Sequence, residues 1–238
     1  GSVTPKEYVP EVHALCRGKC KQCKGPCCLE AGHEQFVPCA CDKCVLTPRD
    51  RGIFKDYDSK ATDAVQLYLD EGLGTVVADC DAKQAQKLAC FLLQKAEDTA
   101  VLTAYTFDLQ ELTQALLGAS TRGVAVLVIG DKDHFKAGVT VNQPDRFEDL
   151  RRGGVQILLT EGWTGNSGIQ HSKTLLTDGY WYLVGSTNWT YSSKKNTEVT
   201  QLVRLNGTGR KVINQRHDNL MSRSESMSEA QATDAKAV

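Results

Sequence analysis

The sequence predicts an α/β protein with a small cysteine-rich segment in front of its sheet. Apolar, strand-like runs alternate with amphipathic helical segments through most of the chain, which is the pattern of an α/β sheet. Eight cysteines fall within 29 residues near the N-terminus, where few apolar residues could build a core. The Ser/Glu/Ala-rich end of the chain is expected to be disordered. We therefore expect a Cys-rich segment at 1–46, a linker with a helix at 47–72, a main domain at 73–220 and a tail at 221–238.

The order of elements in the main domain follows from local patterns. Asp79 or Asp81 can cap a first long helix, and Asp108 can cap the next one, because short acidic side chains accept the free N–H groups of a helix start. In the second helix Leu109 and Leu112 begin a buried leucine stripe that continues to residue 117. The expected elements are a helix near 61–69, a strand at 73–78, a helix to about 96, a strand at 100–105, a helix after 108, a strand at 124–129, a helix near 144–151, a strand at 155–159, a strand pair at 171–184, a strand at 199–205 and a helix at 208–220.

Residues 171–198 carry the most specific chemistry. The order is His171, Lys173, Asp178, the run G-S-T-N at 185–188, and Glu198. On a strand, His171 and Lys173 would share a face because they are two residues apart. Asp-Gly at 178–179 predicts a hairpin turn, so the return strand should bring G-S-T-N back beside His171. The Lys173 ammonium, the Asn188 amide and the Ser186 hydroxyl could then hold one phosphate oxygen.

A neutral imidazole such as His171 can attack phosphorus as a covalent nucleophile. Glu198 is a candidate to orient the ring and fix its tautomer. The leaving oxygen also needs a general acid, usually a second histidine. None of the other four histidines, His13, His33, His134 and His217, repeats the H-x-K pattern. A second copy of His171 from a twofold partner would serve, because a dimer presents the same patch twice across its axis.

These residues resemble the HKD motif of the phospholipase D superfamily. The run from Gly185 to Thr190, with Asn196 and Glu198 after it, is similar to the single-motif branch that includes Nuc-type bacterial endonucleases and Zucchini-type mitochondrial cardiolipin hydrolases. The resemblance extends upstream through the segments 102–107, 111–116 and 122–126. It covers about residues 73–218 and excludes the first 60.

The resemblance implies an α/β/α sandwich with a mixed sheet, a homodimer and a catalytic site that needs no metal. His171 would form a phosphohistidine, and the partner's His171 would act as general acid and then as base for water. Lys173 and Asn188 would bind phosphate oxygens, and Glu198 would hydrogen-bond the His171 ring. Asp178 would be structural rather than chemical, because it lies at the far end of the hairpin.

The charge distribution favours a polyanionic substrate although the net charge is only −1. Residues 13–55 contain eight Lys and Arg against four Asp and Glu, and residues 168–217 contain seven against two. Such clusters attract phosphate backbones. Lys194 and Lys195 are candidate substrate contacts, and Trp163 could stack on a base, although a loop tryptophan is more often a packing residue. No apolar run approaches the ~20 residues that span a bilayer, and no secretory signal is present, so we expect an intracellular protein, with the mitochondrion among the candidate compartments.

The spacings C-x3-C-x2-C-x3-C-C and C-x-C-x2-C suit tetrahedral zinc sites. The candidate ligands are Cys16, Cys20, Cys23, Cys27, Cys28, Cys39, Cys41, Cys44 and His33. Disulfides are the alternative and would require an oxidising compartment. The adjacent Cys27 and Cys28 favour zinc, which would serve a structural role and could display nearby lysines to nucleic acid. Cys80 and Cys90 lie outside the cluster and are expected to be core thiols.

Three functions remain open at this point. The first is an endonuclease acting on single-stranded DNA or RNA, which the basic, cysteine-rich N-terminus favours. The second is a phospholipid hydrolase of the cardiolipin type, which an exposed apolar patch at the dimer groove would favour. The third is a nucleic-acid-binding module without activity, which the intact set of His171, Lys173, Asn188 and Glu198 disfavours.

Overall fold

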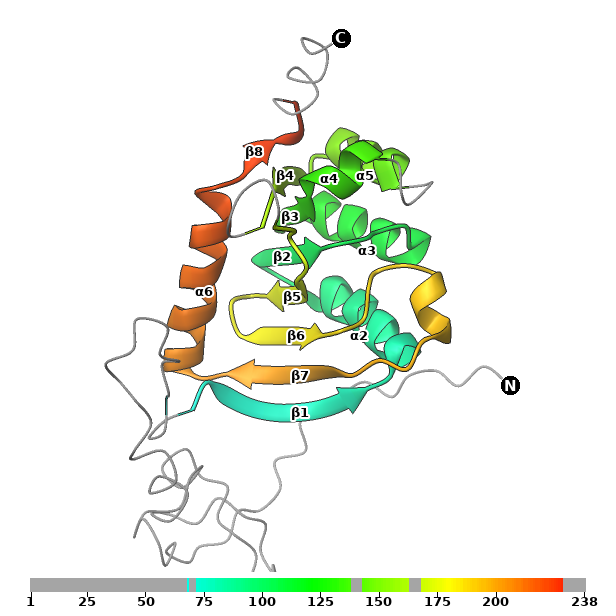
Figure 1. Cartoon of the computed structure of the whole chain (residues 1–238). Coiled ribbons are helices and arrows are strands. Elements are labelled where there is room, and N and C mark those ends of the chain that lie inside the picture. The colour runs from blue at the N-terminus through cyan, green and yellow to red at the C-terminus, as the bar shows by residue number, and fades with distance from the viewer. Residues whose placement is uncertain (1–67, 69–71, 138–142, 163–167, 229–238) are drawn as a thin grey trace, which may run out of the picture. The chain divides into compact units, whose positions relative to one another are not determined.

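The computed structural model describes residues 68, 72–137, 143–162 and 168–228, and the chain divides into two compact units, 1–72 and 73–238. The Cys-rich segment, the helix expected near 61–69 and Trp163 lie outside the described residues, apart from residue 68. Figure 1 shows the second unit, whose described strands form one sheet. The strands are β1 (Gly74–Cys80), β2 (Thr99–Ala104), β3 (Ala125–Asp131), β4 (Gln156–Thr160), β5 (Lys173–Thr177), β6 (Trp181–Gly185), β7 (Thr200–Leu205) and β8 (Glu225–Ser226).

The described sheet has the order β1-β7-β6-β5-β2-β3-β4-β8 and is mixed, as expected. Strands β2, β3 and β4 are parallel neighbours, and the chain crosses between them through helices. Strands β5, β6, β7 and β1 continue the sheet in antiparallel steps from β2. The carboxyl ends of β2 and β3 therefore lie at the same edge as the start of β5, where polar side chains from several strands can meet.

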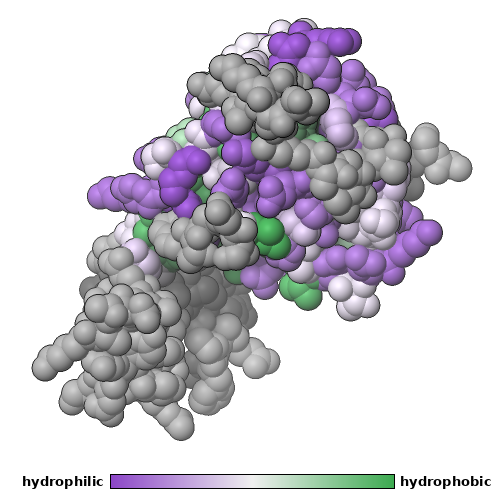
Figure 2. Space-filling view, turned by 45° about the horizontal axis from the view of Figure 1, so that its top comes forward, coloured by the Kyte–Doolittle hydropathy of each residue, from purple (hydrophilic) through white to green (hydrophobic). Residues whose placement is uncertain are grey.

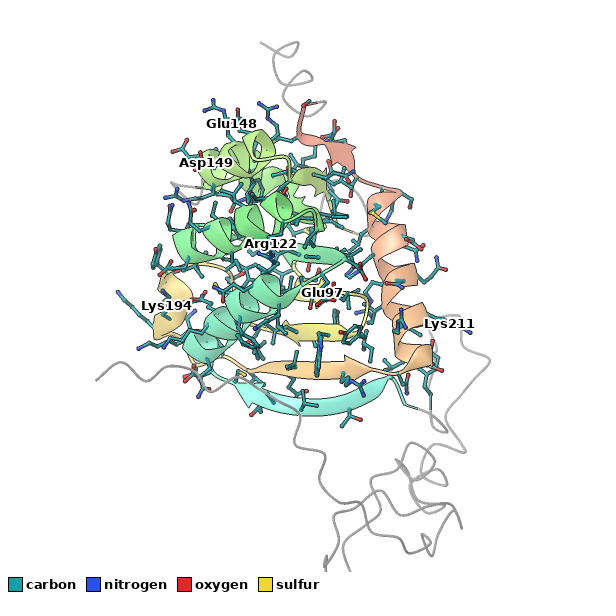
Figure 3. The ribbon with its side chains drawn as sticks, turned by 180° about the vertical axis from the view of Figure 1, so that it is seen from behind. Glu97, Arg122, Glu148, Asp149, Lys194 and Lys211 are labelled. Atoms are coloured by element: carbon teal, nitrogen blue, oxygen red, sulfur yellow. The ribbon has the colours of Figure 1, made fainter. Side chains whose placement is uncertain are left out.

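Helices cover both faces of the sheet. The helices are α2 (Ala82–Lys95), α3 (Gln110–Thr121), α4 (Lys132–Ala137), α5 (Gln143–Arg152) and α6 (Gly207–Met221). On one face Leu102 and Leu175 of the sheet belong to a buried cluster with residues of α2, α3 and α5, including Phe147. On the other face Leu176 and Tyr182 pack with Ile213 of α6. Figures 1 and 3 show the two sides, with α2 and α3 in front of the sheet in Figure 3 and α6 running across the direction of the strands, beside their ends.

The first two helices begin in different ways. Asp81 caps α2 as expected, and together with Gln84 it forms a reciprocal capping box. The prediction that Asp108 caps α3 was wrong: Leu109 is the N-cap residue and makes no side-chain cap bond. The Asp108 carboxylate instead accepts the backbone N–H of Tyr191 at 2.9 Å. The Asp108 side chain is thus directed to the distant loop that carries Tyr191, and it makes no cap bond to the first turn of α3.

The expected start of a disordered tail at residue 221 also needs correction. Residues 225–226 form β8, which pairs antiparallel with β4. Met227 is 3% exposed and belongs to the main core cluster. Lys132 forms an ion pair with Glu225 at 2.7 Å. One buried methionine and a free strand edge are enough to hold this short segment, although its composition is polar. Within the part of the chain that the structure describes, no helix is long and apolar enough to cross a membrane.

Candidate active site

The β5–β6 hairpin places the motif residues at one of its ends. Lys173, the first residue of β5, pairs with Gly185, the last residue of β6. Ser186 and Asn188 follow directly, so they lie at the end of the hairpin where His171 leads into β5. The expected approach of the two motif segments is therefore present, although His171 lies just before the strand rather than on it.

Asp178 lies at the opposite end of this hairpin. Asp178 and Gly179 have positive φ angles of 51° and 72°, as a type I′ turn requires. The Asp178 carboxylate accepts backbone N–H groups of Glu97, Asp98 and Thr99, with the shortest bond, from Asp98, at 2.9 Å. Asp178 thus ties the turn to the start of β2, which suits the structural role expected for it.

Lys173 is buried although it carries an amine. Its side chain is surrounded by protein, the residue is only 5% exposed, and Nζ donates to the His171 carbonyl at 2.6 Å. Nζ also lies 5.0 Å from the ring centroid of Tyr105. Burial lowers the pKa of Lys173 to about 8, against the partly opposing charge of Glu198. A phosphate oxygen at this amine would supply the counter-charge that the site itself only partly provides.

His171 is exposed, yet protein atoms around its ring still displace water. This desolvation lowers the pKa of His171 below its usual value, and the positive charge of Lys173 lowers it further. His134 acts in the same direction, whereas Asp131 opposes the shift. The imidazole is therefore held in its neutral form at neutral pH, which is the nucleophilic form.

The Glu198 carboxylate is fixed by two neighbours. Ser186 Oγ donates to one carboxylate oxygen at 2.5 Å, and Asn196 Nδ2 donates to the other at 3.1 Å. Ser186 Oγ in turn accepts the N–H of Val199 at 3.1 Å. The structure thus brings Glu198 together with Ser186 and near Lys173, and gives it no hydrogen bond to the His171 ring. Ser186, expected to contact phosphate, donates to Glu198 here.

Hydrogen bonds to residues of α2 and β2 hold the segment that carries Asn188. Gln86 of α2 is buried, and its Nε2 donates to the carbonyls of Asn188 at 3.0 Å and Thr190 at 2.9 Å. The Trp189 indole N–H donates to the Thr103 carbonyl at 2.9 Å. The side-chain Oδ1 of Asn188 is buried and has no hydrogen-bond partner in the described structure. Gln86 and Trp189 thus hold the backbone around Asn188, and the Asn188 Oδ1 is a buried acceptor without a donor among the described residues.

Two further residues, Tyr105 and Asp131, lie at the site and were not singled out from the sequence. Tyr105 follows β2, and its ring centroid is 4.5 Å from that of His171 and 4.0 Å from that of His134. Asp131 ends β3, is 1% exposed, and accepts the backbone N–H of Gln170 at 2.7 Å. Tyr105 ends the strand expected at 100–105, and Asp131 comes two residues after the strand expected at 124–129; the structure shows that these two strands are parallel. That position is the sequence signal that could have identified them.

The predicted substrate contacts are only partly placed. Lys194, in the 3-10 helix η1 (Ser192–Lys195), lies 3.5 Å from a Glu111 carboxylate oxygen and 4.5 Å from the Tyr191 ring centroid, and Figure 3 shows it at the edge of the molecule opposite Lys211. Lys195 is exposed. The candidate zinc ligands lie outside the described residues. Among the residues that are described, no three His, Cys, Asp or Glu side chains are grouped so as to hold a metal ion.

Cys80 and Cys90, expected to be core thiols, are free and only partly buried. Cys90 packs against the main core cluster. Burial raises the pKa of both thiols. Cys90 therefore fits a core-lining role, and Cys80 lies in the edge strand β1.

The layered fold and the hairpin that joins His171, Lys173 and Asn188 define the phospholipase D-like class. Residues 90–221 match the family described as cardiolipin synthase, PLD-like domain, which is more than half of the chain. The chain belongs to this family of phospholipase D-like domains.

Curated relatives and solved structures agree with this placement. The mitochondrial cardiolipin hydrolase of Xenopus tropicalis is 32% identical over 112 residues, which are 47% of this chain and 49% of that protein. Cardiolipin synthase A of Serratia proteamaculans is 30% identical over 125 residues, 52% of this chain and 25% of that protein. This chain thus spans at most about half the length of these relatives.

Two solved structures share the fold at low identity. The phospholipase D family member Nuc from Salmonella typhimurium has a TM-score of 0.55 and 19% identity, covering 64% of this chain and 95% of that chain. NucT from Helicobacter pylori has a TM-score of 0.54 and 16% identity, covering 64% and 96%. The match extends over nearly the whole of both bacterial chains and shows the common fold.

Proposed function

We propose that this protein is a phosphodiesterase that cleaves single-stranded DNA or RNA through a phosphohistidine on His171, without a catalytic metal. One observation carries the proposal. Three groups occur together at one end of the β5–β6 hairpin: the His171 imidazole, whose pKa is lowered by desolvation, the buried Lys173 amine, and the Asn188 amide, whose Oδ1 has no hydrogen-bond partner among the described residues. Rotating the Asn188 amide about its last bond would turn its NH2 toward a bound oxygen. A phosphodiester would satisfy all three groups at once.

The reaction would proceed in two displacements. A ring nitrogen of His171 donates its electron pair to phosphorus, and the P–O bond to the leaving group breaks as a general acid protonates that oxygen. Water then attacks the phosphohistidine, a base takes its proton, and the P–N bond breaks to return the free imidazole. Lys173 and Asn188 would stabilise the negative phosphoryl oxygens through both steps.

We propose that the acid and base is His171 of the partner subunit in a homodimer. The site supplies a single exposed imidazole at the hairpin end, and the chemistry requires two. Heterodimers of wild-type and His171→Asn subunits should then turn over poorly. Full activity per wild-type subunit would contradict a shared site and would point to an acid in the same chain, such as His134.

Charge supports a nucleic-acid substrate. The segment 168–217, which includes the site, contains seven Lys and Arg against two Asp and Glu. Figure 2 shows a mainly hydrophilic face over the described residues, with hydrophobic residues in small separate spots. The phosphate backbone of a nucleic acid is attracted to basic, hydrophilic residues of this kind, whereas the acyl chain of a lipid is not.

A phospholipid substrate is the second candidate, because of two exposed apolar side chains near the motif. Ile169, two residues before His171, is 46% exposed, and Val199, next to Glu198, is 59% exposed. Such residues could contact a lipid surface. The similarity to the mitochondrial cardiolipin hydrolase of Xenopus tropicalis points the same way.

Side-by-side incubation tests the proposal. Labelled single-stranded DNA, single-stranded RNA, duplex DNA and cardiolipin vesicles are each offered with EDTA present, with His171→Asn as the matched inactive control. We expect cleavage of a single-stranded nucleic acid that the control lacks. Cleavage of cardiolipin alone would replace the nuclease by the lipid hydrolase, and cleavage that requires added Mg²⁺ would overturn the mechanism.

A further inference from the structure

Tyr105 lies at the centre of the candidate site rather than at its rim. Its ring centroid is 4.5 Å from that of His171 with an interplanar angle of 60°, and 4.0 Å from that of His134 with an angle of 44°. The Lys173 ammonium lies 5.0 Å from the same centroid. One aromatic ring therefore contacts the nucleophile, the phosphate-binding amine and a second imidazole. Tilted ring pairs and a cation near a ring are attractive arrangements.

The far side of this arrangement is anchored by Asp131. Its Oδ1 accepts the backbone N–H of His134 at 2.8 Å and lies 3.7 Å from His134 Nδ1. Its Oδ2 accepts the backbone N–H of Gln170, the residue before His171, at 2.7 Å. The His171 ring therefore contacts Tyr105, which contacts His134. Asp131 binds both His134 and the backbone N–H of the residue before His171. The His171 ring is restrained through its face and through its own chain.

We propose that Tyr105 is a positioning residue, which His134 and Asp131 support from behind and which orients the His171 ring and the Lys173 ammonium for attack on phosphorus. The part of this inference that concerns turnover rests on the proposed function. Tyr105 would not touch the reacting atoms. It would restrict the rotation of an exposed imidazole whose ring has no hydrogen-bond partner among the described residues, since the Glu198 carboxylate is engaged by Ser186 and Asn196.

A positioned nucleophile matters because small displacements of a reacting group are costly. An error of about 1 Å in such a group can reduce turnover about a hundredfold. Loss of the Tyr105 ring should therefore lower kcat more than it raises KM, because substrate would still meet the Asn188 amide and the surrounding basic residues. Loss of the hydroxyl alone should matter little, because the contacts described are made by the ring.

The first test compares three variants on whichever phosphodiester the wild type cleaves. Tyr105→Ala should lower kcat about tenfold to a hundredfold, and Tyr105→Phe should restore most of that loss. Tyr180→Ala is the matched control, because this partly exposed tyrosine lies at the turn end of the same hairpin. Thermal melting checks that each variant is folded. A folded Tyr105→Ala variant with wild-type kcat, or a Tyr105→Phe variant as impaired as Tyr105→Ala, would overturn the proposal.

The second test needs no activity and so separates this inference from the proposed function. The His171 ring protons are followed by NMR as the pH changes, and are identified by their absence in His171→Asn. In Tyr105→Ala, water should return to the ring, so the titration should move to higher pH, whereas Tyr105→Phe should titrate like the wild type. If Tyr105→Ala does not fold, Tyr105→Val, which keeps an apolar side chain but removes the ring, should move the titration the same way by a smaller amount. An unchanged His171 titration in the folded variant overturns the positioning role.

Discussion

At the scale of single residues, burial lowers the pKa of two groups at the site, and the two end in different protonation states because their ordinary pKa values differ. Desolvation disfavours the charged form of both His171 and Lys173. His171 starts from an ordinary value near neutrality and becomes reliably neutral. Lys173 starts far above neutrality, and a pKa of about 8 still leaves it mostly charged at pH 7. The same burial thus favours the neutral nucleophile, whereas Lys173 stays mostly a cation in spite of it, because its ordinary pKa is high.

These two groups predict a bell-shaped pH dependence of kcat/KM for the free enzyme. Activity should fall on the acid side as His171 gains a proton, and on the alkaline side, near pH 8, as Lys173 loses one. In Lys173→Arg, whose guanidinium stays charged, any residual activity should lack the alkaline fall. An alkaline fall at the same pH in that variant would show that another group causes it.

His217 makes a separate prediction about stability. It is 4% exposed, its Nδ1 has no hydrogen-bond partner among the described residues, and burial lowers its pKa to about 4. The unfolded chain therefore takes up the proton first as the pH falls below about 6.5, and the folded state should lose on the order of 2–3 kcal/mol by pH 4. Replacing this residue in His217→Leu should flatten the dependence of unfolding free energy on pH between these limits. An unchanged slope would show that His217 does not cause the loss.

The motif residues could be predicted from the sequence because their chemistry lies within one short segment. A single hairpin places Lys173 and Asn188 at the same end, and the Asp-Gly pair at 178–179 predicts the turn of that hairpin. Tyr105, His134 and Asp131 could not be assigned in this way, because only the pairing of β2 with β3 and β5 brings them to His171. The sequence also led us to expect the His171 ring as the partner of Glu198. In the structure the Glu198 carboxylate accepts hydrogen bonds from Ser186 and Asn196 instead.

At the scale of elements, the hairpin turn is fastened to the neighbouring strand by Asp178. Asp178→Ala should remove the acceptor for three backbone N–H groups and place alanine at a positive φ. We expect a loss of about 1–2 kcal/mol in unfolding free energy. Asp178→Asn, which keeps one acceptor oxygen and tolerates this φ, should lose less than half as much. Denaturant melts measure both, and equal losses would contradict the role assigned to the carboxylate.

Element boundaries were predictable where a local signal had no competitor. Asp81 caps α2 with its own Gln84 three residues later, so the whole signal lies in the sequence. Asp108 carries a similar local signal, but the Tyr191 N–H, 83 residues away, takes its carboxylate. Strand β8 was not predicted, because a strand of two residues is too short to show an alternation of apolar and polar side chains. Its stability comes from the β4 edge and from Met227 burial, both of which are tertiary effects.

At the scale of the whole molecule, the segment 1–46 stays a prediction, since it lies outside the described residues. If zinc holds it, strong chelation should make this segment sensitive to protease while residues 73–220 stay protected. Reduction with a thiol in the absence of chelator should leave it protected. Sensitivity after reduction alone would indicate disulfides instead. Limited proteolysis followed by mass spectrometry measures the cleavage of segment 1–46 after each treatment.

Intact-mass analysis of the protein quenched during turnover tests the central claim most directly. With a single-stranded substrate that leaves a 5′-phosphorylated product, wild-type protein should gain the mass of that product fragment. The fragment should be joined through its phosphate to the peptide containing His171 by a P–N bond that is stable in alkali and broken in acid. The adduct should be absent from His171→Asn. Steady turnover without an adduct at any quench time, or an adduct on a different residue, would contradict the account.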